Sequence, residues 1–229
     1  MRRFLFILTL TISLLALASE PRVSRALDTE LSISPVVQRT PVWCWVAVGE
    51  MIFEHLSVPN VNPAGEYQCG IIGAMAGPYH PCWSDCTRCV VPAGSPQNIT
   101  NMLRRYPQIA GGLTGESIRG VRSRRATRAL TVDEIKEELD NDRPIIAGIS
   151  PSGITGPFAQ HVALIIGYEE DEDALTLIVN DPYPYQYVGN RADPYLLAGG
   201  DGGQGQYRIP YNNFRRRLGW TESFYDLQQ

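Results

Sequence analysis

The stretch QRTPVWCWVAVGEMIFEH, residues 38–55, decides the fold. Four apolar residues after Cys44 recur at helical spacing, while the acidic residues of the stretch face away from them. The four are Ala47, Val48, Met51 and Ile52. Pro41, just upstream, is typical of a chain that is entering a helix. The stretch therefore predicts a helix that begins at Cys44 and turns one apolar face to a core.

Cys44 at the start of this helix is a candidate nucleophile. The unpaired N–H groups of a helix N-terminus carry partial positive charge, which favours a thiolate over a thiol. The alternative is a buried structural cysteine packed between Trp43 and Trp45. Gln38, six residues upstream, favours the first interpretation. Its side-chain amide and the Cys44 backbone N–H would together form an oxyanion hole.

Three histidines are candidates for a general base. His55 lies eleven residues along the predicted helix from Cys44, about 16 Å away at 1.5 Å per residue, and is too far. His80 lies beside a cluster of cysteines. His161 follows a loop rich in Gly, Pro and Ser and opens an apolar run typical of a strand. We therefore expect His161 to be the base.

A hairpin places an acid near His161. Residues 169–173, EEDED, read as a solvated loop rather than a calcium site, because the EF-hand ligand pattern is absent. If these five residues close the hairpin, Tyr168 pairs with Ala174. His161 then lies directly opposite Asp181, with Cβ atoms roughly 5 Å apart.

Asp181 would in that register orient the His161 imidazole, as the third member of a nucleophile–base–orienter set. A slip of one residue would give this role to Asn180. Asn180 is therefore the reserve candidate.

The other four cysteines, Cys69, Cys82, Cys86 and Cys89, crowd one segment. In an exported protein they predict two disulfides, in one of three connectivities that spacing alone does not choose. Three of them with His80 would otherwise make a zinc site, which export disfavours. Cys44 is then the odd cysteine. No other metal or cofactor is expected.

The first residues are typical of a secretory signal peptide. Arg2 and Arg3 precede an apolar run that ends in the small-residue pattern Ala16-Leu17-Ala18. The run is shorter than the ~20 residues of a spanning helix, although a signal anchor is the alternative. We expect residues 1–18 to be removed and residues 19–229 to form one domain. The mature protein should be secreted or periplasmic, with no stable membrane insertion.

The remaining pattern places helices before strands, which predicts an α+β fold. Helices are expected from the Ser95-Pro96 cap to about Arg105, from a Thr131/Glu134 capping box to Leu139, and over 211–218. Strands are expected over 144–150, 161–168, 174–180 and 223–227. Residues 57–94, 107–129 and 199–205 are expected to be loops.

The chain carries a formal charge of −4, with 44% hydrophobic residues, enough for a core. A mildly acidic chain is not an obvious nucleic-acid binder. Five arginines nevertheless form a local basic cluster: Arg119, Arg122, Arg124, Arg125 and Arg128. We interpret this cluster as a solvated loop face.

Three motifs resemble papain-like cysteine peptidases: QRTPVWCW from Gln38, QHVALIIGY from Gln160, and VNDP from Val179. The resemblance is strongest to the bacterial branch that includes AvrRpt2-type effectors and C39-like peptidases, over roughly residues 36–184. It implies a helical lobe whose N-terminal catalytic helix packs against an antiparallel β lobe. It also implies Cys44 as nucleophile, His161 as base, Asp181 as orienter and Gln38 in the oxyanion hole.

The expected activity is hydrolysis of peptide bonds through an acyl-enzyme, with a peptide or protein as substrate. The same residues would also serve an acyltransferase or a deamidase. A binding module with an inactive site is the third hypothesis.

Overall fold

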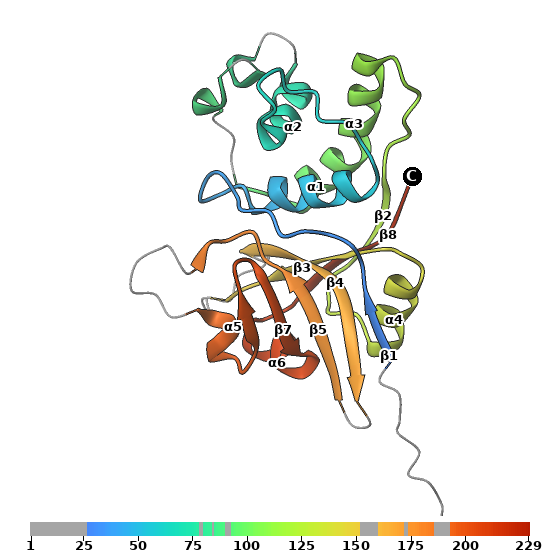
Figure 1. Ribbon diagram of the computed structural model, residues 1–229, viewed down its shortest axis with the longest axis vertical. Helices are drawn as coiled ribbons and strands as arrows, with labels where there is room; N and C mark the ends of the chain where they lie inside the picture. The colour runs from blue at the N-terminus through green and yellow to red at the C-terminus, as the bar shows by residue number, and fades with distance from the viewer. Residues whose placement is uncertain are drawn as a thin grey trace, which may run out of the picture.

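The computed structural model describes residues 27–77, 80–83, 85–89, 93–151, 160–171, 174–185 and 193–229. The fold is α+β and compatible with the papain-like architecture: three helices form a lobe against one end of an antiparallel sheet (Figure 1). The predicted signal peptide, residues 1–18, lies outside the described residues. Within the described part, no helix combines the length and apolar character needed to cross a membrane.

The helical lobe consists of α1 (Cys44–His55), α2 (Tyr67–Ala76) and α3 (Pro96–Thr114). The prediction that a helix begins at Cys44 is confirmed. Helix α3 begins as predicted, with the Ser95 hydroxyl accepting from the Asn98 N–H, but it runs nine residues further than expected. It continues through Pro107 because its apolar face stays buried as far as Gly111, and packing outweighs the lost hydrogen bond.

Helix α2 was not predicted, because its sequence YQCGIIGAMA contains two glycines within a turn-rich segment. Close packing explains the second of them. A β-carbon at Gly73 would lie 3.0 Å from the Trp83 Cα, in the 3-10 turn Pro81–Trp83. A second 3-10 turn, Cys86–Arg88, follows.

The sheet has eight strands in the order β2-β8-β3-β4-β5-β7-β6, with β1 paired to β4, and every pair is antiparallel. The strands are β1 (Leu27–Glu30), β2 (Arg122–Ala126), β3 (Ile145–Ile149), β4 (His161–Asp171), β5 (Ala174–Asn180), β6 (Asp201–Gly203), β7 (Gln206–Pro210) and β8 (Glu222–Gln228). Strand β3 and most of β4 and β5 are buried, and form the centre of the core. Gly167 allows β1 to approach β4, since a β-carbon there would lie 2.4 Å from the Thr29 carbonyl oxygen.

The predicted register of the β4–β5 hairpin is wrong. Asp171, rather than Tyr168, pairs with Ala174, so the strands extend into the acidic run. Cross-strand and helix partners neutralise two of these acids: Lys136 pairs with Glu170, and Arg208 with Glu169. A bulge between Ile165 and Gly167 then shifts the pairing by one residue.

Three short helices accompany the sheet: α4 (Val132–Asp140), α5 (Pro194–Leu197) and α6 (Tyr211–Arg217). The predicted capping box of α4 is confirmed, with Thr131 and Glu134 each bonded to the other's backbone N–H.

Two segments expected to be loops contain strands. Residues 201–203 form β6. The interpretation of the arginine cluster as a loop face is wrong in part, because Arg122–Ala126 is the edge strand β2, paired with β8. The strand forms because its backbone bonds to β8, while its arginines remain exposed to water.

Candidate active site

Cys44 is the first residue of α1 and the only cysteine of the chain outside a disulfide. Its neighbours Trp43 and Trp45 are buried in the lobe's core and fix the start of the helix, while Cys44 itself is half-buried. The first N–H groups of an α-helix have no partner within the helix. The Cys44 sulfur therefore lies in the field of a free helix N-terminus.

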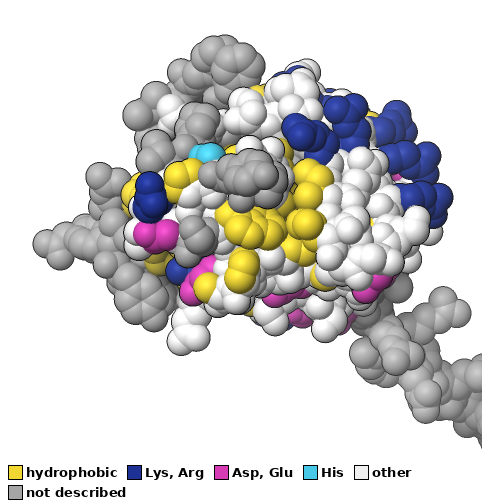
Figure 2. Space-filling view, turned by 90° about the horizontal axis from the view of Figure 1, so that it is seen from above, with side chains coloured by type: hydrophobic (Ala, Val, Ile, Leu, Met, Phe, Trp, Pro, Cys, Tyr) yellow, Lys and Arg dark blue, Asp and Glu magenta, His cyan; other side chains and the backbone are white. Residues whose placement is uncertain are grey.

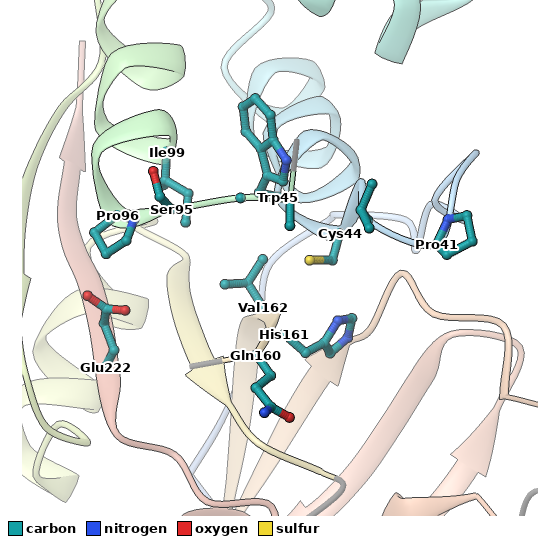
Figure 3. Close-up of a pocket in the computed structure, with 13 residues that line it drawn as sticks. Pro41, Cys44, Trp45, Ser95, Pro96, Ile99, Gln160, His161, Val162 and Glu222 are labelled. Carbon is teal, nitrogen blue, oxygen red and sulfur yellow. The ribbon is translucent and has the colours of Figure 1, made fainter. Parts of the chain in front are cut away.

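His161 is the first residue of β4, which packs against α1. It pairs with Ile149 of β3, and its side chain is only 12% exposed. Cys44 and His161 both line one pocket between the helical lobe and the sheet (Figure 3). The structure thus brings the predicted nucleophile and base together from the two lobes.

Asp181 follows the last residue of β5 and is buried. Its Oδ1 lies 2.7 Å from His161 Nε2 and accepts the Tyr183 N–H at 2.8 Å. The two side chains meet although they are not the cross-strand partners that we predicted, because β5 ends at Asn180 opposite Leu164. With Nε2 bonded to Asp181, Nδ1 of the ring is left for Cys44.

The pKa of His161 reflects the opposing effects of burial and of two neighbouring side chains. Burial lowers it, but the Asp181 carboxylate and the Cys44 side chain raise it more strongly, from 6.5 to about 10. The imidazolium is therefore the stable form at neutral pH, held between a carboxylate and a sulfur. Such a ring can donate a proton to a leaving group and later take one from water.

Tyr195 is a partner of Asp181 that the sequence did not predict. Its hydroxyl donates to Asp181 Oδ2 at 2.8 Å, and its ring stacks on Tyr207 with centroids 4.1 Å apart. Burial, and then the nearby Asp181 carboxylate, raise the pKa of Tyr195 well above its ordinary value, so the hydroxyl keeps its proton. Asp193 caps α5 by accepting the Tyr195 N–H at 2.9 Å. The Asp-Pro pair at 193–194 indicates such a helix, but nothing local indicates the contact with Asp181.

Asn180, the reserve candidate, has other partners. Its Nδ2 donates to the Ile33 carbonyl oxygen at 2.7 Å, and its Oδ1 accepts from Gln206 at 3.1 Å. The first contact holds the segment before α1 to β5, and the second joins β5 to β7. The Asn180 side chain is fully buried. The structure therefore gives Asn180 contacts within the fold rather than with His161.

Gln38 is buried before α1, with its N–H bonded to the Pro182 carbonyl oxygen at 2.9 Å. Its Nε2 donates to the Thr40 carbonyl oxygen at 2.7 Å, and its Oε1 is buried without a partner in the described part. Gln38 is not among the residues that line the pocket of Cys44. The bond to Thr40 uses one of the two N–H groups of the amide, which leaves the other for a further acceptor.

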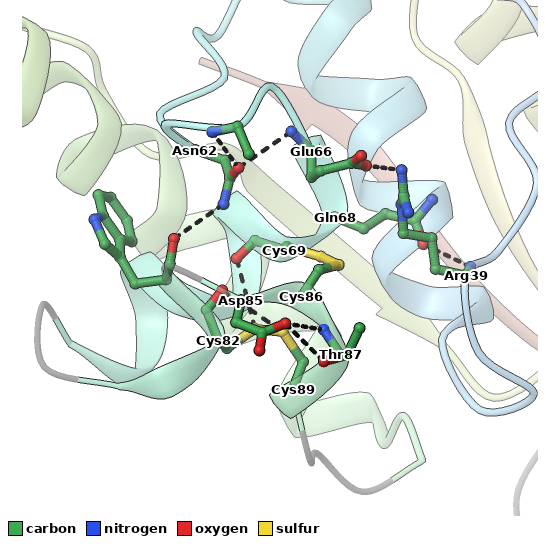
Figure 4. The surroundings of a disulfide bond; sticks show 12 residues. Arg39, Asn62, Glu66, Gln68, Cys69, Cys82, Asp85, Cys86, Thr87 and Cys89 are labelled. Carbon is green, nitrogen blue, oxygen red and sulfur yellow. Dashed lines mark hydrogen bonds and ion pairs between the residues drawn. A yellow bond between two sulfur atoms is a disulfide. The ribbon is translucent and has the colours of Figure 1, made fainter.

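Gln68 of α2 holds the loop on both sides of Gln38. It accepts the Arg39 N–H at 3.0 Å and donates to the Val37 carbonyl oxygen at 3.0 Å (Figure 4). It also donates to Glu50 at 2.8 Å. Burial raises the pKa of Glu50, and the bond from Gln68 opposes this. The cysteine-rich segment thus supports the segment that leads to Cys44.

Two disulfides hold that segment: Cys69–Cys86 and Cys82–Cys89, with Cα atoms 5.5 and 4.4 Å apart (Figure 4). The prediction of two bridges is confirmed, with its connectivity now assigned. The alternative zinc set with His80 is not assembled. The one group of potential ligands in the described part consists of Cys69, Cys86 and Cys89, all three of them in these bridges. The His80 ring instead accepts the Cys82 N–H at 3.2 Å.

The pocket that Cys44 and His161 share has a volume of about 100 Å³. One wall is the extended segment 93–95, which lies flat on Trp45: a β-carbon at Gly94 would come within 2.6 Å of the indole. Ile99 and Val162 add apolar surface, and Glu222 of β8 closes the far end (Figure 3).

The family model described as Peptidase_C39 like family matches residues 30–197. The matched span includes Gln38, Cys44, His161 and Asp181. No curated protein matches the chain.

Proposed function

Because the chain belongs to the Peptidase_C39-like family, we propose that it is a cysteine peptidase that hydrolyses peptide bonds through Cys44, His161 and Asp181. The observation that carries the proposal is the chain of contacts from Cys44 through His161 to Asp181, at a pocket between the two lobes. From the three sequence motifs we also propose the closer likeness to the bacterial branch that includes AvrRpt2-type effectors.

The chemistry follows from the protonation state of this pair. Cys44 Sγ attacks the carbonyl carbon, and the C–O double bond becomes a single bond to an oxyanion. The Cys44 backbone N–H and the second N–H of the Gln38 side-chain amide stabilise that charge. The His161 imidazolium then gives its proton to the leaving amine, and the C–N bond breaks to leave a thioester.

Hydrolysis of the thioester restores the enzyme. Neutral His161 takes a proton from water, and the hydroxide adds to the thioester carbon. The C–S bond breaks, the acid product leaves, and the thiolate–imidazolium pair forms again. Asp181 holds the ring by accepting from Nε2 throughout, and Tyr195 holds Asp181.

We propose that the chain is exported after removal of residues 1–18. The two disulfides support this, because such bridges persist in oxidising compartments.

The test is thiol labelling of the oxidised protein followed by peptide mapping. With four cysteines in disulfides, iodoacetamide can react only at Cys44 without reductant. We expect labelling at pH 6 to be far faster than that of a free peptide thiol, which is largely protonated there. Cys44→Ser should fold but lose nearly all peptide hydrolysis. Slow labelling at pH 6, or hydrolysis by Cys44→Ser near the wild-type rate, would refute the assigned nucleophile.

A further inference from the structure

Five exposed arginines gather on the side of the molecule that holds α3 and β2. We call them the arginine face: Arg104, Arg105, Arg119, Arg122 and Arg124. Within the described residues none of the five has an ion-pair partner. Arg122 makes only a long hydrogen bond to Gln228, at 3.4 Å, and the Arg124 guanidinium lies over the Tyr225 ring at 5.2 Å from its centroid.

The loop between α3 and β2 brings these arginines together. The Val121 N–H donates to the Leu103 carbonyl oxygen at 3.0 Å. A β-carbon at Gly120 would lie 2.1 Å from the Arg104 carbonyl oxygen, so the loop lies directly on α3. Figure 2 shows Lys and Arg side chains gathered along this side of the molecule.

None of these five arginines forms an ion pair in the described part, although the chain as a whole is acidic, with a formal charge of −4. Like charges within a Debye length of about 8 Å repel one another at physiological salt. An anionic ligand would relieve this repulsion. The face therefore favours a partner that carries several negative charges.

The backbone beside the arginines favours a polypeptide over other polyanions. β2 is the last strand on its side of the sheet and pairs with β8 alone in the described part. An edge strand presents unpaired N–H and C=O groups, to which an extended peptide can add as a further strand. Polyphosphates and anionic lipids offer no backbone for such pairing.

The arginine face also continues from the pocket of Cys44. Arg125, on the same strand β2, forms an ion pair with Glu222, and Glu222 closes the far end of that pocket. A substrate that leaves the pocket beside Glu222 in an extended conformation would reach Arg125 and then the edge of β2, along which Arg124 and Arg122 lie. Five extended residues cover about 17 Å, enough to run along this strand.

We propose that the arginine face binds an acidic segment of the polypeptide substrate, near the bond that is cleaved. This inference rests on the proposed function, and it names a substrate class: proteins with a run of Asp or Glu close to the cleavage site. The Glu222–Arg125 pair joins the pocket to the binding surface.

The experiment uses the oxidised protein carrying Cys44→Ser, so that binding is measured without turnover. The probe is a fluorescein-labelled peptide of twelve residues that contains six consecutive Glu, and its match contains six Gln. Fluorescence anisotropy should show at least tenfold tighter binding of the Glu peptide, weakening as salt is raised. The triple change Arg119→Glu, Arg122→Glu, Arg124→Glu should remove this preference.

The matched control is Arg215→Glu, Arg216→Glu, Arg217→Glu on α6, which changes the net charge equally on a helix that packs against β5 and β7. It should bind the Glu peptide within about twofold of the parent. Circular dichroism checks that both triple variants fold. Gln substitutions at Arg119, Arg122 and Arg124 should reduce the preference for the Glu peptide less than the Glu substitutions do.

Three results would overturn the inference: equal binding of the Glu and Gln peptides, an equal loss in the α6 control, or tight binding of inorganic polyphosphate with none of the Glu peptide. Arginines that only protect the sheet edge from aggregation would give the first of these. Cys44 labelling in the wild-type background reports the proposed function separately. If Cys44 is not labelled but the Glu peptide still binds, the proposed peptidase activity is rejected. The binding of an acidic segment by the arginine face then still stands.

Discussion

Replacing Asp181 by Asn removes the charge beside His161 but keeps its shape. The amide Oδ1 can still accept from His161 Nε2, and the Tyr195 hydroxyl can turn to accept from the new Nδ2. The substitution therefore separates the electrostatic effect of Asp181 from its effect on ring orientation. Asp181→Ala removes both.

The expected effect on His161 is large. Its pKa is about 10, against 6.5 for an ordinary histidine, although burial alone lowers it. The Asp181 carboxylate is the strongest of the groups that raise it. In a Cys44→Ser background, which removes the effect of the Cys44 sulfur, we expect the His161 pKa to lie well above 6.5 with Asp181 and below 6.5 with Asp181→Asn.

Nuclear magnetic resonance of the imidazole rings measures this directly, because the chain has only three histidines. Activity follows in the Cys44 protein: the alkaline limb of the pH profile should move to lower pH in Asp181→Asn. Asp181→Ala should in addition lower turnover by roughly 10²- to 10⁴-fold, the range seen when an orienting carboxylate is lost. An unchanged His161 titration in Asp181→Asn would refute the electrostatic reasoning.

The same pair makes stability depend on pH. Because the His161 pKa in the folded protein is raised above its unfolded value, the stabilisation is fully present below about pH 6.5 and is lost as pH rises through about 10. The difference in melting temperature between wild type and Asp181→Asn should therefore shrink over this window. A difference that stays constant from pH 6 to 10.5 would contradict this assignment.

Three further changes test neighbouring features. Gln38→Ala should lower kcat roughly ten- to a thousand-fold with little change in substrate binding, the effect of losing one oxyanion donor, and a purely raised KM would reject that role. Asn180→Ala should lower the melting temperature, because it leaves buried groups of the fold unpaired, while the turnover of the protein that remains folded stays close to wild type. Cys69→Ser with Cys86→Ser opens a bridge of sequence separation 17 and should lower the free energy of unfolding by about 3 kcal/mol in urea titrations, and no loss would show that the bridge does not constrain the unfolded chain.

The sequence predicted correctly those elements whose formation depends on residues close together in the chain. The helix from Cys44 and the capping box at Thr131 depend on spacing and on neighbours within a few residues, and both are present. The two disulfides were also predicted, from the clustered cysteines and the expected export. Their pairing did not, because it depends on the turns of a segment whose conformation the sequence does not determine locally.

The hairpin register failed for a nonlocal reason. Three acidic residues entered β4 because distant partners, Lys136 and Arg208 among them, neutralise two of these acids, and no rule about the sequence of the hairpin contains those partners. The bulge at Ile165 then moved the pairing again. His161 and Asp181 still meet, but the contact is made beyond the paired residues rather than across them.

Neither lobe contains the candidate site alone, so the segment that joins them decides its geometry. Residues 31–38 run along the sheet before the chain enters α1. They are bonded to it at three points: Leu31 N–H to Ile166 O at 2.8 Å, Asn180 Nδ2 to Ile33 O at 2.7 Å, and Gln38 N–H to Pro182 O at 2.9 Å.

The last of these bonds lies one residue past Asp181, so the same backbone that carries the acid also fixes the approach to Cys44. Gln68 holds that approach from the helical side, at Val37 and Arg39. A cysteine at the start of one lobe can meet a histidine at the start of a strand in the other only if this segment is held from both sides. The buried polar residues Asn180 and Gln68 therefore hold the segment that leads to Cys44, whereas Asp181 holds the His161 ring itself.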